Sequence, residues 1–291
     1  MKKERIITLG NASSGKSNYM GLSLGYICRY RKDLPILGEN SSFIDNINQS
    51  EKVMQSGRWL DKTQNRTELH FKAKLPIWSW FPFLTSEHEF VVDDWMGEAF
   101  EALGNLDKWE SDYGLNPDLK DPFLKAIAEA ENYVVFLDGE KWKEQDVENN
   151  VQESLRKLQQ LLQDSQLSLA DRRFAIVVTK ADVLENLPEF AHESGDGLDI
   201  AKLQQHVTSK YPSFFNFLDW YKLSYRVFAV SCVPVKEHLR VDPEKGVVPA
   251  SDWSMKDLES LLVHVDDSFL RQEATRRRHD QLAPFRWLFR Y

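Results

Sequence analysis

A glycine-rich pattern near the start of the chain constrains the fold more than any other feature of the sequence. G-x-x-x-x-G-K-[ST] is met between residues 10 and 17, directly after an apolar run and before a helical pattern. Glycines let backbone N–H groups curl around an anion, and the following helix N-terminus adds favourable partial charge. The pattern predicts a phosphate loop made of Gly10, Asn11, Ala12, Ser13, Ser14, Gly15, Lys16 and Ser17.

Two side chains of this loop carry its expected chemistry. The Lys16 ammonium can neutralise phosphate oxygens, and the Ser17 hydroxyl can ligate Mg²⁺. The alternative is a glycine–serine turn without a ligand. The strand pattern before the loop and the helix pattern after it favour the phosphate-binding interpretation.

Apolar runs rich in Val, Ile and Phe alternate with longer helical patterns along the chain. This alternation predicts an α/β fold of the P-loop NTPase type, with a mostly parallel six-stranded sheet and helices on both faces. The expected strands are 6–9, 69–75, 89–92, 133–137, 174–178 and 227–230. The expected helices are 16–29, 117–130, 146–162, 200–210 and 254–278.

Composition limits the class of protein further. The chain has 291 residues, 42% of them hydrophobic, which fits a folded protein with a sizeable core. A net charge of −8 argues against general nucleic-acid binding. No apolar stretch approaches about 20 residues, so we expect no transmembrane segment. The start resembles no signal peptide, and the two cysteines form no disulfide framework, so we expect a cytoplasmic protein.

We expect one P-loop domain over residues 1–283. It contains a long polar switch-like loop at 33–66, with room for a short helix, and an insertion at 185–222. Residues 284–291 form a basic and aromatic tail. The tail is either a solvated end with a short docked segment or a peptide that docks on a protein partner.

A second motif follows the expected strand 89–92. Asp94 and Gly97 form a D-x-x-G pattern, in which the carboxylate can reach Mg²⁺ and the glycine N–H can meet a γ-phosphate. Glu98 comes next, where it could orient or deprotonate an attacking water.

A third and a fourth segment supply residues that could recognise a guanine base. Thr179, Lys180 and Asp182 form T-K-x-D after the strand 174–178, and the carboxylate could accept from guanine N1–H and its exocyclic N–H₂. Ser231 and Cys232 follow the strand 227–230, where backbone amides could hold the guanine carbonyl oxygen. Adenine lacks this donor face, so an ATPase is the less favoured alternative.

These four segments, in this order at strand ends, resemble the Ras-like branch of P-loop GTPases. The resemblance spans residues 5 to about 270 and implies GTP or GDP with Mg²⁺ as ligands. Shorter matches, Gly57-Arg58-Trp59 followed by Thr63, the segment 97–100 and the strand end 136–138, look like the bacterial double-GTPase families associated with conflict or defence gene clusters.

The first switch of such enzymes supplies a threonine to Mg²⁺ and the γ-phosphate. Thr63 and Thr67 both precede the expected second strand, and we favour Thr63 because Thr67 directly adjoins the strand. Either could instead be an ordinary loop threonine. Arg58 and Arg66 are candidate catalytic arginines in this loop, although solvated loop arginines are the favoured interpretation.

Two positions depart from the family pattern and predict slow or partner-assisted hydrolysis. Glu98 stands where these enzymes usually have glutamine, and its charge would face the γ-phosphate. Ala12 occupies a loop position that is often glycine. We therefore expect a GTP-dependent conformational switch that contacts a protein partner, with a nucleotide-locked scaffold subunit as the alternative.

Overall fold

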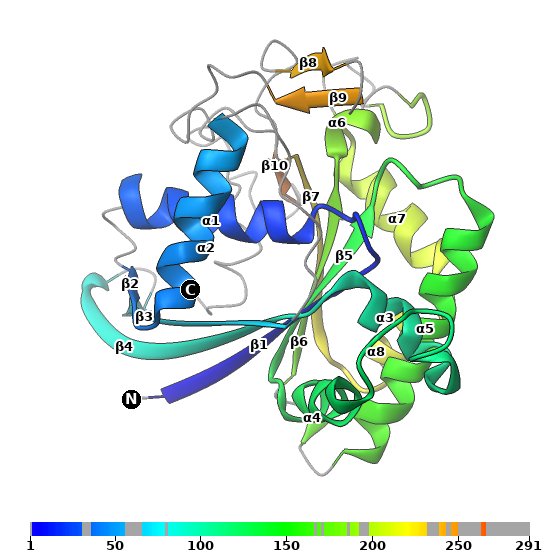
Figure 1. Cartoon of the computed structure of the whole chain (residues 1–291), viewed down its shortest axis with the longest axis horizontal. Helices are drawn as coiled ribbons and strands as arrows, with labels where there is room; N and C mark the ends of the chain where they lie inside the picture. Colours follow the sequence, from blue (N-terminus) through cyan, green and yellow to red (C-terminus); the bar gives the residue numbers. More distant parts are fainter. Residues whose placement is uncertain are drawn as a thin grey trace.

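The computed structural model is built around one mixed β-sheet (Figure 1). It describes residues 2–30, 36–55, 66–78, 81–165, 168–169, 172–184, 187–191, 198–231, 239–242, 246–249 and 263–265. The sheet has eight strands in the order β10-β7-β6-β5-β1-β4-β3-β2. These strands are β1 (Lys2–Gly10), β2 (Ile36–Gly38), β3 (Thr67–Trp78), β4 (Phe81–Asp94), β5 (Asn132–Asp138), β6 (Arg173–Thr179), β7 (Ser224–Val230) and β10 (Val263–Val265).

The six predicted strands all form, but the predicted strand number is wrong because two short strands extend the edges. Strands β7, β6, β5, β1 and β4 are mutually parallel. Strand β3 pairs antiparallel with β4, while β2 and β10 add antiparallel edges on β3 and β7. Each edge strand has three residues, too few for an alternating pattern to appear in the sequence.

Strand β10 also corrects the helix predicted over 254–278. Only residues 263–265 of that range lie among the described residues, and they are extended. Val263 and Val265 are β-branched, and their backbone pairs with Val230 and Phe228 of β7. Pairing along the sheet edge therefore overrides the helical pattern at this point.

Helices cover both faces of the sheet, as predicted (Figure 1). Helices α1 and α2 lie on one face, and α3, α4, α5, α7 and α8 lie on the other. The bounds are α1 (Lys16–Tyr30), α2 (Ser41–Gln55), α3 (Gly97–Leu103), α4 (Lys120–Glu129), α5 (Gln145–Asp164), α6 (Ala181–Leu184), α7 (Ile200–Lys210) and α8 (Pro212–Trp220). A separate two-stranded sheet pairs β8 (Leu239–Asp242) with β9 (Gly246–Pro249).

The alternation of strand side chains creates two cores. In β5 all seven residues are buried. Tyr133 and Val135 join the cluster beneath the larger helical layer, whereas Val134 and Phe136 join the cluster beneath α1 and α2. Successive side chains of a strand point to opposite sides, so a strand that is buried on both faces has a nearly continuous apolar sequence.

Two predicted elaborations contain regular structure. The segment 33–66 includes β2 and the fifteen-residue helix α2, which is longer than the short helix that we expected. The insertion 185–222 contributes α7 and α8. Thr63, Cys232 and the tail 284–291 lie outside the described residues. Within the described ranges, no helix combines the length and the apolar character needed to cross a membrane.

Candidate functional site

The phosphate-loop pattern adopts a tight turn between β1 and α1. Gly10 has φ 154° and Gly15 has φ 76°, which are backbone conformations that favour glycine. A Cβ atom on Gly10 would lie 2.7 Å from the Phe136 carbonyl oxygen. The Ser14 N–H donates to the Asn11 carbonyl oxygen at 3.2 Å and closes the turn. The two glycines are therefore required by the turn itself and by its contact with β5.

Lys16, Ser17 and Asp94 meet at the carboxyl ends of β1 and β4. The Ser17 hydroxyl donates to Asp94 Oδ2 at 3.2 Å, and Lys16 Nζ lies 3.7 Å from Asp94 Oδ1. Thr8 Oγ1 donates to the same Oδ1 at 2.6 Å from the facing position on β1. A hydroxyl and a carboxylate oxygen offer the hard ligands that Mg²⁺ prefers, beside a cation suited to phosphate.

Helix α3 begins directly against the loop. A Cβ atom on Gly97 would lie 2.2 Å from the Ala12 nitrogen, so only glycine allows this approach. One turn later, Glu101 Oε1 accepts a hydrogen bond of 2.8 Å from the Ala12 N–H. Glu98 is partly buried in the first turn of the same helix. The D-x-x-G segment and the phosphate loop are thus in direct contact.

Asp93, beside Asp94, belongs to a separate ion-pair group. Its side chain is buried, with Arg66 Nε donating to Oδ1 at 2.7 Å and Arg5 Nη1 3.9 Å from Oδ2. Burial raises the pKa of Asp93, and the Arg66 guanidinium opposes the rise without cancelling it. We expected Arg66 to be a solvated loop arginine; this expectation is wrong, because Arg66 pairs with the buried Asp93 at the β3–β4 boundary.

The T-K-x-D segment ends β6 next to the phosphate loop. Thr179 Oγ1 lies 2.6 Å from the Ser14 carbonyl oxygen, its acceptor, and thereby connects the two loops. Lys180 Nζ donates to Asp138 at 2.9 Å and to Glu140 at 2.7 Å. Burial alone would lower the pKa of Lys180, but the bonds to Glu140 and Asp138 outweigh it and raise the pKa above its ordinary value.

Asp182 lies opposite the end of β7. The Ser231 hydroxyl donates to Asp182 Oδ1 at 2.8 Å, and Ser231 is buried. This bond orients the carboxylate. The structure therefore brings the T-K-x-D motif and Ser231 together, while Cys232 lies outside the described residues.

The sequence assigned no site role to three residues at this edge, Thr8, Glu101 and Asp138, although the strand end 136–138 was part of the family resemblance. Thr8 had a signal in principle, since it is a polar residue in an apolar run just before the loop. Of the two switch threonines, Thr63 is outside the described residues. Thr67 lies in β3, opposite Asp94 in the backbone register.

Two buried polar atoms test whether the loop suits a polar ligand. Ser14 is 1% exposed and Asn11 is 8% exposed. Among the described residues, neither Ser14 Oγ nor Asn11 Oδ1 has a hydrogen-bond partner. Buried polar atoms usually have one, so unsatisfied groups in this loop, beside Lys16 and Ser17, fit a site for phosphate and Mg²⁺.

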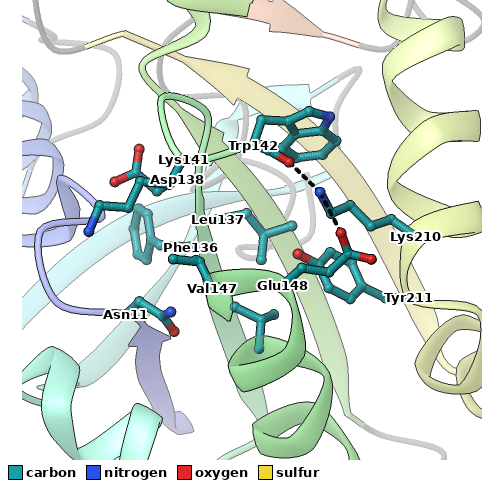
Figure 2. Close-up of a pocket in the computed structure, with 11 residues that line it drawn as sticks. Asn11, Phe136, Leu137, Asp138, Lys141, Trp142, Val147, Glu148, Lys210 and Tyr211 are labelled. Atoms are coloured by element: carbon teal, nitrogen blue, oxygen red, sulfur yellow. Dashed lines mark hydrogen bonds and ion pairs between the residues drawn. The ribbon is translucent and has the colours of Figure 1, made fainter. Parts of the chain in front are cut away.

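A pocket lies next to the loop, between the end of β5, the start of α5 and the end of α7 (Figure 2). Asn11 and Asp138 line one side of it. On the other side, Lys210 Nζ donates to the Trp142 carbonyl oxygen and lies 3.0 Å from Glu148 Oε2. The Lys210 ammonium is therefore already paired within the protein, and Lys141 is a second cation in the pocket lining.

Sheet and loop together define an α/β protein whose phosphate-loop pattern lies at the carboxyl edge of a mostly parallel sheet. No protein-family model matches the chain, and no curated protein matches its sequence. The solved structures similar to it include a bacterial selenocysteine-specific elongation factor, EF-Sec, at 12% identity and a TM-score of 0.35. The match covers 80% of this chain and 26% of that chain, about a quarter of its length.

Proposed function

We propose that this chain binds GTP with Mg²⁺ at the carboxyl edge of its sheet. One observation carries the proposal: a hydrogen bond joins two groups of residues with complementary chemistry. Lys16, Ser17 and Asp94 form the first group, and Asp182 with Ser231 forms the second. The bond from Thr179 to the Ser14 carbonyl connects them. The residues that bind phosphate and those that recognise the base would thus lie at the same carboxyl edge of the sheet.

In this proposal the first group binds the phosphates. Loop N–H groups and Lys16 would bind phosphate oxygens, while Ser17 and Asp94 would hold the metal. Bound Mg²⁺ would supply neutralisation of the phosphate charge. Thr8 keeps Asp94 oriented through its 2.6 Å bond, so the carboxylate requires little reorganisation. The predicted role of Thr63 stays part of the proposal.

The second group, Asp182 with Ser231, would recognise the base. Guanine presents two adjacent N–H donors, whereas adenine has no N1–H, so an oriented carboxylate favours guanine. Ser231 holds one oxygen of Asp182 at 2.8 Å. The Lys180 side chain, fixed by Asp138 and Glu140, stiffens the same loop. Backbone amides near Ser231 and Cys232 complete the proposed reader.

Substitution of Asp182 by asparagine tests base recognition. Asp182→Asn replaces an acceptor by an amide that also donates, so GTP affinity should fall roughly 10- to 100-fold. Xanthosine triphosphate, which carries a carbonyl in place of the guanine amine, should regain part of the loss. Titration with fluorescent nucleotides measures both.

The exposed Asp164, at the end of α5, offers a matched control with the same chemical change. Asp164→Asn should bind GTP like the unmodified protein. An unchanged GTP affinity in Asp182→Asn would contradict the assignment of the base reader.

We further propose that hydrolysis is slow or assisted by a partner and that loss of the γ-phosphate changes the conformation of 33–66 and 94–100. Glu98 in the water-orienting place and Ala12 in the loop support slow turnover. The proposed output is contact with a protein partner in the cytoplasm. The short sequence matches at 57–63, 97–100 and 136–138 extend the proposal to a bacterial defence system of the double-GTPase type.

A nucleotide-locked scaffold subunit is the second candidate. Two residues favour it. Glu98, in the first turn of α3, stands where a water-orienting glutamine is usual, and Ala12 occupies a loop position that is often glycine, so a bound nucleotide would turn over little. Single-turnover hydrolysis, measured alone and with a captured partner, separates the two candidates: phosphate release above buffer in either case excludes the scaffold, and its absence in both excludes the enzyme.

A further inference from the structure

Glu101 binds a phosphate-loop amide that no motif assigns to it. Its Oε1 accepts the Ala12 N–H at 2.8 Å, and Gly97 of the same helix abuts Ala12. N–H groups of such a loop are the donors that bind anions. One donor of this loop is therefore taken by a carboxylate of the protein itself.

The backbone that carries Glu101 is fixed in place. The Ser154 hydroxyl, fully buried on α5, donates to the Phe100 carbonyl oxygen at 2.7 Å. A Cβ atom on Gly104 would lie 2.9 Å from Glu153 Cβ, so the end of α3 also packs closely on α5. Helix α3 cannot slide away from the loop without breaking these contacts, and Glu101 can leave only by rotating its side chain.

The charged side chains around the loop determine how the position of Glu101 affects phosphate binding. Lys16 is paired with Asp94 across 3.7 Å, so the loop cation already faces one carboxylate. Glu101 adds a second carboxylate on the Ala12 side. Like charges within a few ångströms repel strongly at a partly buried site. A nucleoside triphosphate brings one more phosphate than a diphosphate does and therefore meets more of this repulsion.

We propose that Glu101 sets the selectivity of this site between nucleoside triphosphate and nucleoside diphosphate, by competing with the terminal phosphate for the Ala12 end of the loop. The inference rests on the proposed nucleotide binding. Glu101 acts as an internal anion: it lowers affinity for the triphosphate more than affinity for the diphosphate.

Glu101→Gln tests this inference, since glutamine keeps a carbonyl oxygen to accept the Ala12 N–H but has no charge. Dissociation constants for a non-hydrolysable GTP analogue and for GDP are measured for both proteins with Mg²⁺ present. The ratio of triphosphate to diphosphate affinity should rise about tenfold in the variant. High salt should shrink this difference between the proteins, because the effect is electrostatic. Glu110→Gln, at an exposed position, should leave the ratio unchanged.

The outcomes separate the two proposals. Measurable binding with the same ratio in the unmodified protein and in Glu101→Gln overturns the role of Glu101. Absence of binding for both nucleotides in the unmodified protein overturns the proposed function itself. If Glu101→Gln fails to fold, Glu101→Ala is measured in its place, and an unchanged ratio there likewise overturns the inference.

Discussion

Consecutive aspartates at the end of β4 have separate environments because strand side chains alternate. Asp94 lies beside Lys16 and Ser17, whereas Asp93 accepts from Arg66. Asp93 is 2% exposed and Asp94 is 3% exposed, so burial does not distinguish them. Their partners do. Asp94 lies beside the cation and the hydroxyl of the proposed phosphate site, and Asp93 fastens the start of β3 to the sheet.

Loss of Arg66 should therefore affect stability in a pH-dependent way. Among the described residues, Arg66→Ala leaves the buried Asp93 carboxylate with the more distant Arg5 as its cation. We expect a loss of roughly 1–3 kcal/mol in the free energy of unfolding near neutral pH. Burial already raises the folded-state pKa of Asp93 above its unfolded value. The stability that Asp93 contributes is therefore largest at low pH. It is lost as the pH rises from the unfolded-state pKa to the higher folded-state pKa.

Urea unfolding at several pH values measures this effect. The difference between Arg66→Ala and the unmodified protein should shrink as the pH falls toward about 4, because a protonated Asp93 needs no cation. Arg156→Ala, which removes an exposed ion pair with Glu153, is the control and should change little. A loss that is constant across this pH range would contradict the assigned pairing.

Individual site residues were predictable where their motif has fixed spacing. Gly10 and Gly15 follow from the phosphate-loop pattern, because the turn has positive φ at both positions. Asp94 follows from the D-x-x-G pattern at the end of a predicted strand. Thr8 and Glu101 were not predictable in their roles. Thr8 reaches Asp94 through the register of β1 on β4, and Glu101 reaches Ala12 through the packing of α3 on the loop. Both depend on contacts between residues far apart in sequence, 86 and 89 residues respectively.

At the element scale, the contact between α3 and the phosphate loop should depend on Gly97. A Cβ atom there would lie 2.2 Å from the Ala12 nitrogen and 2.5 Å from the Asn11 carbonyl carbon, and backbone atoms cannot move aside cheaply. Gly97→Ala should separate helix and loop, lower the free energy of unfolding by about 1–3 kcal/mol and weaken GTP binding. Urea unfolding and nucleotide titration measure the two effects.

Gly114→Ala provides the control for this substitution. A Cβ atom on Gly114 would have no atom of the described residues within 4 Å, although φ is 62°, so the change should cost about 1 kcal/mol and leave GTP affinity unaltered. Gly97→Ala with the GTP affinity of the unmodified protein would contradict the proposed role of this contact.

Elements were predictable in proportion to their length and periodicity. The helix expected over 200–210 forms over the same residues as α7, and the six longer strands all form. The edge strands β2 and β10 escaped prediction because each has three residues and gains its stability from pairing. Helix α3 was not predicted because seven residues with a mostly buried surface give little periodic signal.

At the scale of the whole molecule, the parallel order β7-β6-β5-β1-β4 unites segments that are far apart in sequence. Parallel strands present their carboxyl ends at one edge, so Gly10, Asp94, Thr179 and Ser231 meet there. The crossover helices α1 and α5 fill opposite faces and hold these ends in register. The candidate site is therefore a consequence of sheet order.

Competitive binding of GTP and ATP, with and without Mg²⁺, tests the central claim most directly. Isothermal titration of the unmodified protein should give GTP at least about a tenfold advantage over ATP, with both affinities reduced when Mg²⁺ is chelated. Equal affinity for GTP and ATP, or no binding of either nucleotide, would contradict the account.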